Sequence, residues 1–339
     1  MSFPGLDKIE FEEPKCIFCK EKQSLTKVLD APDRLNKLPG TFSLVKCGNC
    51  GLVFQSPRPK EEFIGNFYPD ELHYFIPNQE TVKPIKAWLE TKVLINFFGY
   101  TNLGKGNFFS KVLFLPAYYY FFRHKTIPHY VPNGKILEIG CSHGAFLAQL
   151  KKWGWDVVGI EMNAKAADYA RNTRGFEVLT GSITDIDLPS NSFDAIIAEM
   201  VMEHLYDPQA VVARMSNSLK KNGELIFSIP FFEGAEYGLF KDFSYGLHLP
   251  NHIYFFNKSN IAQLLNDNFD RIKIFFHHFD RDFIASAKYK YEDNKKFIWK
   301  LISQSKAVKH FLIRPLVFIL SVMQKTSRVT VRAYKKDQA

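Results

Sequence analysis

A glycine turn between a short apolar strand and a helix is the feature that most constrains the fold. In Leu137-Glu-Ile-Gly140-Cys-Ser-His-Gly144-Ala-Phe-Leu, two glycines four residues apart let the backbone approach a ligand at a helix N-terminus. Glu161 follows 21 residues after Gly140, at the end of the next apolar run. Dinucleotide-type folds place an acid there to bind both hydroxyls of a ribose, whereas the alternative for Glu161 is a surface acid. Turn and acid together predict a ligand that contains a ribose.

Strands and helices alternate regularly from Pro132 onward. The expected strands are 135–139, 156–160, 176–179, 193–198 and 224–229, and the expected helices are 144–153, 164–173 and 208–219. Such alternation indicates βαβ units and therefore a mostly parallel sheet in an α/β fold. Two further strands, 271–278 and 328–332, would bring the sheet to seven strands, with helix-like sequence between them.

Three segments are expected along the chain. Residues 1–60 hold four of the five cysteines, and residues 61–130 form a helical, aromatic-rich connecting segment. Residues 131–339 form the core, with a basic helical insertion at about 281–325 before the last strand.

Two Cys-x-x-Cys pairs, Cys16/Cys19 and Cys47/Cys50, are separated by 27 residues. Four thiolates in this arrangement are typical of a tetrahedral structural Zn²⁺ site, a zinc ribbon. The alternatives are disulfides, which are unusual in a cytoplasmic protein, and chance spacing. With all four positions filled by protein, such a zinc ion would have no catalytic role. The fifth cysteine, Cys141, lies in the glycine turn and is predicted to be a small packing residue.

Four segments, LEIGCSHGAFL, GIEMN, FDAIIAEMVMEHLYDP and LKKNGELIFSIP, resemble in order and spacing the motifs of class I S-adenosylmethionine-dependent methyltransferases. The resemblance covers about residues 131–280 and implies a Rossmann-like core with S-adenosylmethionine as methyl donor. The cofactor-binding residues that it implies are Glu138, Gly140, Cys141, Ser142, Gly144, Glu161, Ser182, Ile183 and Glu199. The chain departs from the family pattern at Ser142-His143 in the turn. It also departs at Ser182, with Asp185 nearby, where the family often has an acid for the adenine amino group.

The N-terminal pattern, CxxC followed by KCGNCGLVFQSPRP, is similar to a zinc-binding module fused to methyltransferases of sugar metabolism and surface-polysaccharide biosynthesis. This resemblance implies a sugar or glycan acceptor. It also implies that His252, in Leu249-Pro-Asn-His252-Ile-Tyr-Phe-Phe, stands near the acceptor as the catalytic base. Asn251 stands where the carbon-methylating members have an acid, so methylation of oxygen is favoured.

Two further histidines compete with His252 for the catalytic role. Glu203-His204 follows the strand 193–198, at the edge where acceptors sit in open α/β sheets. Since a histidine within reach of a sugar hydroxyl can remove its proton, His252 and His204 are the leading candidates, with Glu203 beside them. His248 is the third histidine.

The net charge of +9 is unevenly distributed. Residues 131–280 have 13 Lys and Arg against 18 Asp and Glu, whereas residues 80–130 have 7 against 2 and residues 281–339 have 14 against 4. Basic flanks rich in Phe and Trp predict peripheral contact with an anionic membrane surface, and the alternative is that these apolar residues pack on the core or form a dimer interface. No run is long enough for a transmembrane helix and the first residues do not resemble a signal peptide, so a cytoplasmic protein is expected.

Two rival functions stay open at this point. One is a ribosomal-RNA methyltransferase that binds RNA through the zinc ribbon. Nucleic acid is the less favoured partner, because residues 1–60 are only mildly basic, with 10 Lys and Arg against 7 Asp and Glu. The other is a zinc-ribbon binding protein with an inactive core, against which the intact Gly140, Gly144 and Glu161 argue.

Overall fold

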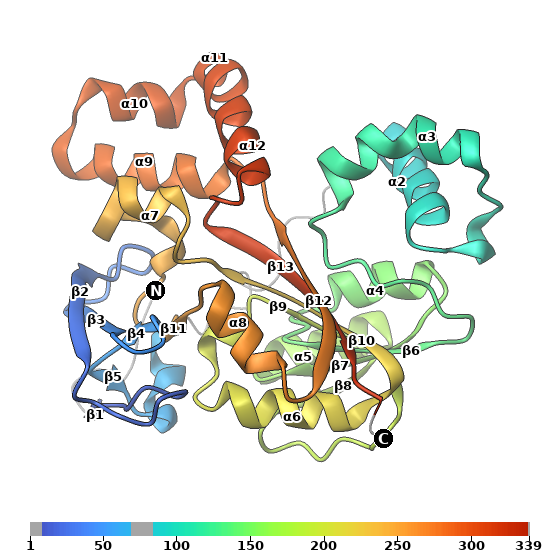
Figure 1. Cartoon of the computed structure of the whole chain (residues 1–339), viewed down its shortest axis with the longest axis horizontal. Coiled ribbons are helices and arrows are strands. Elements are labelled where there is room, and N and C mark those ends of the chain that lie inside the picture. The colour runs from blue at the N-terminus through green and yellow to red at the C-terminus, as the bar shows by residue number, and fades with distance from the viewer. Residues whose placement is uncertain (1–8, 69–83, 338–339) are drawn as a thin grey trace.

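A twisted seven-stranded sheet forms the centre of the molecule, and helices cover both of its faces (Figure 1). The computed structural model describes residues 9–68 and 84–337. The strand order is β12-β13-β10-β9-β6-β7-β8, and only β13 runs antiparallel to its neighbours. The bounds are β6 (Lys135–Ile139), β7 (Asp156–Glu161), β8 (Glu177–Thr180), β9 (Phe193–Glu199), β10 (Leu219–Pro230), β12 (Phe269–Phe276) and β13 (Arg328–Lys335). The α/β fold with a mostly parallel seven-stranded sheet is thus confirmed.

Some of the helices between these strands begin at side-chain caps. Asn163 accepts a hydrogen bond from the backbone N–H of Ala166, 2.9 Å away, and Asp207 accepts one from Ala210 at 3.0 Å. Such caps satisfy amide groups that have no partner within the helix. The helices are α4 (Ala145–Lys152), α5 (Ala164–Arg174), α6 (Pro208–Ser218) and α8 (Lys258–Leu265). Because helices cover both faces, the central strands β6 and β9 are buried almost throughout.

The four cysteines belong to a smaller sheet that the core completes. Its order is β11-β4-β3-β2, with β2 (Leu25–Pro32), β3 (Thr41–Cys47), β4 (Val53–Gln55) and β11 (Tyr254–Phe255), and a separate pair joins β1 (Phe11–Glu12) to β5 (Arg58–Pro59). Strand β11 comes from the crossover between β10 and β12, and Tyr254 lies opposite Phe54. Phe54 and Leu52 belong to one hydrophobic cluster with Ile196 and Phe227 of the large sheet. Part of the N-terminal module therefore shares the core of the large sheet, while Phe42, Leu44 and Phe67 form a second cluster with Tyr237 and Phe255. Its first eight residues lie outside the described part of the chain.

Two helical units stand on the same side of the molecule, in the upper part of Figure 1. The first, in the connecting segment, contains α2 (Pro84–Phe97), α3 (Phe108–Ala117) and η4 (Tyr118–Phe122), and residues 69–83 of this segment lie outside the described ones. The earlier η2 (Glu61–Phe67) packs instead in the N-terminal module, through Ile64 and Phe67. The second contains α7 (Ala235–Phe240), α9 (Arg281–Asn294), α10 (Phe297–Gln304), α11 (Lys306–Val308), η8 (Lys309–Ile313) and α12 (Arg314–Val322). In the second unit Phe240, Phe283, Ile313 and Val317 form a small core.

We expect Phe54→Ala to lower the free energy of unfolding of the whole chain by about 3–5 kcal/mol, because it removes a fully buried ring at the junction of the two sheets. Chemical denaturation would measure this, with Phe11→Ala as a matched control, since Phe11 is 45% exposed and its loss should change stability by less than about 0.5 kcal/mol. A separate early transition of the cysteine module alone would contradict the shared core.

Candidate functional site

The glycine turn at the end of β6 takes left-handed backbone conformations at both glycines. Gly140 has φ +73° and Gly144 has φ +75°, so a side chain at either position would be strained. A Cβ on Gly140 would also lie 2.8 Å from the side chain of Val201. The N–H groups of Gly140 and Cys141 bond to the carbonyl of Ile160, at 2.8 and 3.0 Å, which ties the turn to the end of β7.

Glu161 ends β7 and fastens the same turn. Its Oε2 accepts a hydrogen bond from the N–H of Ser142 and its Oε1 accepts one from Asn163, both at 2.8 Å. Burial raises the pKa of Glu161, although these backbone donors oppose the rise. Each carboxylate oxygen can accept a further hydrogen bond, so the side chain can still bind a diol such as the two hydroxyls of a ribose.

Three carboxylates meet where β6, β7 and β9 end. Glu138 is buried on β6 and its Oε2 has no hydrogen-bond partner among the described residues. Burial raises the pKa of Glu138 well above its usual value, and the nearby carboxylates of Glu199 and Glu161 raise it further. Such a cluster would be stabilised by a cation, because a positive charge would compensate both burial and repulsion.

Cys141 has a packing role in the turn. A Cβ on Gly159 of β7 would lie 2.5 Å from the Cys141 sulfur, so the thiol fills the space that the glycine leaves open. Burial raises the pKa of Cys141 above its ordinary value, as expected for a thiol that is not a nucleophile.

The turn after β8 places Ser182 and Ile183 near the same edge of the sheet. Ile183 is buried in the main hydrophobic cluster. The Ser182 Oγ accepts a hydrogen bond from the N–H of Thr184 at 3.2 Å and lies 2.7 Å from the Thr184 hydroxyl, which in turn lies 3.0 Å from Asp185. The Ser182 hydroxyl is therefore already engaged within its own turn, and we expect any contribution to adenine binding to come through the remaining capacity of that hydroxyl.

A cavity of about 300 Å³ lies at the carboxyl edge of the sheet, and we call it the edge cavity. Glu199 from the end of β9 lines it, together with His277 just after β12 and Thr330 near the start of the antiparallel β13. His124 and Lys125, from the segment after η4, complete part of its wall. Small-molecule sites in open α/β folds form at this edge. Sequence patterns did not single out His277, His124 or Thr330, because none lies in a recognisable motif.

Hydrogen bonds around His277 fix which of its ring nitrogens carries the proton. The Thr330 hydroxyl donates to the carbonyl of His124 at 2.5 Å, and its oxygen lies 2.8 Å from His277 Nε2. Since the single hydroxyl proton is already used, Thr330 Oγ1 must accept from an Nε2–H. His277 Nδ1 then has a lone pair and no partner among the described residues. Burial lowers the pKa of His277 well below its usual value, so the ring is neutral, and Nδ1 could take a proton only where a nearby negative charge offsets that burial.

Glu203, His204 and His252, predicted from the sequence as catalytic, do lie together. His252 Nε2 is 3.8 Å from Glu203 Oε1, and the rings of His204 and His252 are 4.7 Å apart. His252 Nδ1 bonds to the carbonyl of Gly246 at 2.9 Å, and His204 Nδ1 to the carbonyl of Asn251 at 2.8 Å. Glu203 and His252 are almost completely buried, whereas His204 is half-buried and lies within 3.0 Å of the Tyr68 hydroxyl.

Burial sets the protonation of this group. It raises the pKa of Glu203 to about 8 and lowers that of His204 to about 4, so near pH 7 the carboxyl is protonated and the imidazole neutral. Their ligand atoms and that of His252 all lie within 4.8 Å of one another, so the three residues could also hold a metal ion. His248, the third histidine, stacks on His252 at 4.8 Å.

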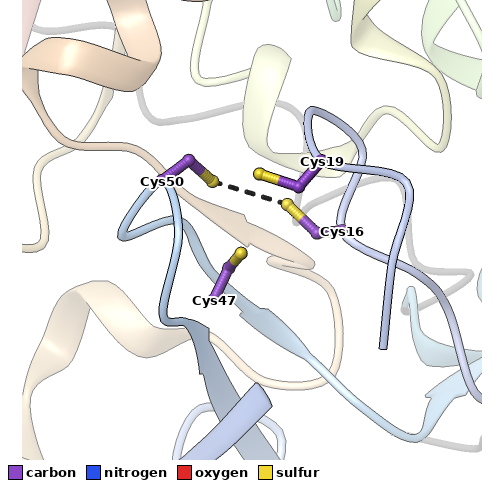
Figure 2. Close-up of side chains that lie close together, drawn as sticks. All are labelled: Cys16, Cys19, Cys47 and Cys50. Carbon is purple, nitrogen blue, oxygen red and sulfur yellow. Dashed lines mark hydrogen bonds between the residues drawn. The ribbon is translucent and has the colours of Figure 1, made fainter. Parts of the chain in front are cut away.

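The four cysteine sulfurs converge from two matching turns (Figure 2). They lie within 4.8 Å of one another, and those of Cys16 and Cys50 are 3.5 Å apart. Tetrahedral zinc with Zn–S bonds of about 2.3 Å places its sulfurs about 3.8 Å apart, so the donor set and spacing fit zinc. The residue after each pair, Lys20 and Gly51, has a positive φ and bonds back to the first cysteine of its pair. Burial tends to raise the pKa of Cys47, but the N–H groups of Cys50 and Asn49 lower it to about 7.

Comparison with known proteins agrees with this geometry. A family model described as a methyltransferase domain matches residues 70–269, which are 200 of the 339 residues. The chain belongs to the methyltransferase domain family. The glycine turn and the three carboxylates lie within the residues that this model matches.

Similarity to individual proteins covers less of the chain. A ubiquinone biosynthesis O-methyltransferase of Pectobacterium atrosepticum is 28% identical over 104 residues, which are 28% of this chain and 42% of that protein. One from Coxiella burnetii is 30% identical over 98 residues, 27% of this chain and 42% of that protein. The chain thus spans less than half the length of these relatives.

Among solved structures, a methyltransferase of Archaeoglobus fulgidus is 18% identical with a TM-score of 0.42, over 60% of this chain and 86% of that one. A possible histamine N-methyltransferase of Thermotoga maritima is 22% identical with a TM-score of 0.40, over 61% and 84%.

The residues of the methyltransferase domain fit S-adenosylmethionine. The unpartnered Oε2 of Glu138, within a cluster of three carboxylates, calls for positive charge, and the cofactor carries both a sulfonium and an ammonium group. Glu138 and Glu199 would face that charge, and Glu161 would bind the ribose hydroxyls.

We expect Glu161→Ala to weaken S-adenosylmethionine binding by about 1.5–3 kcal/mol, the usual cost of losing hydrogen bonds to a charged group. Calorimetric titration would measure this, with Glu177→Ala as a matched control, since Glu177 is an exposed carboxylate on the neighbouring strand β8. Unchanged affinity in a folded Glu161→Ala variant would remove Glu161 from the ribose site.

We expect the purified, reduced protein to contain one zinc ion per chain at the four cysteines. Cys47→Ser should lose it, because zinc binding and folding of so small a module are coupled. Cys141→Ser, outside the cluster, should keep it. Elemental analysis would decide, and wild-type protein without zinc would rule the site out.

Proposed function

We propose that the protein transfers the methyl group of S-adenosylmethionine to a hydroxyl of a sugar, nucleotide sugar or lipid-linked glycan. The proposal rests on the edge cavity, which Glu199 and His277 both line, and on the buried, unpartnered Nδ1 of His277. Methylation of a hydroxyl needs a place for a cationic methyl donor and a group that accepts the hydroxyl proton. Glu199 and His277 are the residues of the edge cavity that could serve these two needs.

The proposed acceptor class is supported by resemblance to other methyltransferases and by the volume of the edge cavity. The N-terminal cysteine module resembles that of sugar methyltransferases, and the ubiquinone biosynthesis relatives are named as O-methyltransferases, which supports oxygen as the acceptor atom. A cavity of about 300 Å³ is at the small end of the range for ligand sites, in keeping with one sugar unit.

The chain's own residues supply positioning and proton transfer. When bound, S-adenosylmethionine supplies an electrophilic methyl group, which the acceptor oxygen takes while the carbon–sulfur bond electrons pass to sulfur. His277 accepts the hydroxyl proton at Nδ1, and Thr330 holds the tautomer that leaves this nitrogen free. Glu199 in the same cavity favours the imidazolium that forms, since the carboxylate is negatively charged.

His204 is the second candidate base. It is half-buried and Nδ1 is engaged with the Asn251 carbonyl, so Nε2 would have to accept the proton. His252 lies behind it, almost fully buried beside Glu203, and its role is then to position His204.

We expect His277→Gln to lower turnover about 10²-fold or more, the usual worth of a general base, with S-adenosylmethionine affinity unchanged. Thr330→Val should lower turnover less and shift its pH dependence. The imidazole ring of His277 remains in this variant, but no hydroxyl fixes which of its nitrogens carries the proton. His204→Ala and His252→Ala are the comparison variants. Normal turnover in His277→Gln together with a 10²-fold loss in His204→Ala would move the base to His204.

The acceptor itself can be found by transfer of label from methyl-labelled S-adenosylmethionine. We expect labelling of nucleotide sugars or of lipid-linked glycans. Labelling of ribosomal RNA instead would favour the rival RNA methyltransferase. Absence of cofactor binding by calorimetry would favour a non-catalytic protein.

A further inference from the structure

Large apolar side chains stand exposed on the outer ends of both helical units. In the first unit these are Phe108, Phe109 and Leu113 of α3, and in the second they are Phe297 of α10 with Phe311 and Leu312 of η8. Phe109 is 83% exposed and Phe311 84%. Apolar surface concentrated in this way on a folded chain indicates an interaction site. The expectation that such residues pack on the core holds for Trp299 and Ile302, which contact the small core of the second unit, but not for these six.

Positive charge accompanies these apolar side chains. Residues 92–125 contain five Lys and Arg and no acid, and residues 297–327 again contain five and no acid. Acids elsewhere pair some of them, since Glu90 lies 3.7 Å from Lys125 and Asp280 lies 2.9 Å from Arg314. Lys111, Lys300 and Lys306 remain exposed beside the apolar ends.

Two further cavities lie between the helical units and the edge cavity and share lining residues with it or with each other. A cavity of about 490 Å³ lies between Ala117 and Tyr119 of the first unit and Phe318 of α12 in the second. Tyr120 and Phe121 also line its neighbour, a cavity of about 590 Å³. That neighbour in turn shares His124, Lys125 and Phe279 with the edge cavity. Shared lining residues therefore link the cavity at Ala117 and Phe318 with the edge cavity that Glu199 and His277 line, while the six exposed side chains line none of the three.

We propose that the two helical units lie on an anionic membrane and that these cavities admit the hydrocarbon chain of a lipid-carried acceptor. The proposal rests on the proposed methyl transfer and narrows its acceptor to one held in a bilayer. Among the described residues no helix is long and apolar enough to cross a membrane, so the contact is with the surface. Helices of this composition lie in the headgroup layer, and each nearby Lys or Arg adds about 1 kcal/mol of attraction to an anionic leaflet.

Charge argues against a second copy of the chain as the occupant. In a two-fold dimer the same patch faces itself, so two basic surfaces would meet and repel. An anionic bilayer matches both the apolar ends and the cations.

Flotation of the full chain with lipid vesicles tests the membrane contact. We expect it to float with phosphatidylcholine vesicles that contain phosphatidylglycerol at low salt, and not with phosphatidylcholine alone or at high salt. Phe109→Ser with Phe311→Ser, and separately Lys300→Glu with Lys306→Glu, should each reduce the bound fraction about tenfold or more. Lys152→Glu, on the exposed face of α4, is the matched control and should float like the wild type.

Other results overturn the proposal. Wild-type protein that stays off the anionic vesicles, or paired variants that float as well as the wild type, would exclude the membrane. A different outcome is a wild type that fails to float and elutes as a dimer in size-exclusion chromatography. If Phe109→Ser and Phe311→Ser then convert it to a monomer, the surface is a dimer interface. Calorimetric binding of S-adenosylmethionine should be unchanged in all variants, so its failure in the wild type would reject the methyltransferase proposal independently of flotation.

Binding of dodecyl phosphate below its micelle concentration tests the cavities. We expect it to bind where inorganic phosphate does not, and to lose its affinity in Ala117→Trp, which fills the outer cavity, with a smaller loss in Ala117→Leu. Equal binding of inorganic phosphate, or unchanged affinity in both Ala117 variants, would rule out a site for the chain.

Discussion

Three carboxylates at the end of three adjacent parallel strands are the constraint around which the methyltransferase domain is organised. Parallel strands end at one edge, so the order β7-β6-β9 brings Glu161, Glu138 and Glu199 together. Glu138 and Glu161 are buried, at a cost, beside the exposed Glu199, and Glu138 has a carboxylate oxygen without a partner among the described residues. A cation bound there during function would let the carboxylates stay ionised, because a positive charge offsets both burial and repulsion. Sheet order, glycine turn and edge cavity then form a single site.

The cysteine module is part of this architecture. Strand β11 supplies the fourth strand of the small sheet, and the Asn260 side chain at the start of α8 donates to the carbonyl of Cys50 at 3.0 Å. Loss of the cysteine cluster would therefore disturb the crossover that carries His248 and His252. Zinc in this position would stabilise one wall of the fold at a distance from the chemistry, a structural role in keeping with a closed four-thiolate site.

The two helical units make one side of the molecule different in composition from the other. One side carries the small sheet and the outer helices of the core, and the other carries basic, apolar-tipped helices whose cavities lead to the edge of the sheet (Figure 1). A hydroxyl acceptor placed from that side would meet His277 beside Glu199, the carboxylate that would also face the cofactor. The two helical units thus carry the exposed apolar surface and line cavities that adjoin the edge cavity.

Sequence by itself determined what depends on local spacing. The strands and helices from β6 to β10, the turn between Gly140 and Gly144, the acid at Glu161 and the paired cysteines all follow from residues close along the chain. Tertiary structure decided what depends on distant contacts. His277, Thr330 and His124 meet only because β13 inserts between β10 and β12, so no motif could point to them. It also decided that Phe109 and Phe311 stay exposed while Ile313 is buried, because the burial of an apolar residue depends on what packs against its helix, which a helical pattern does not specify.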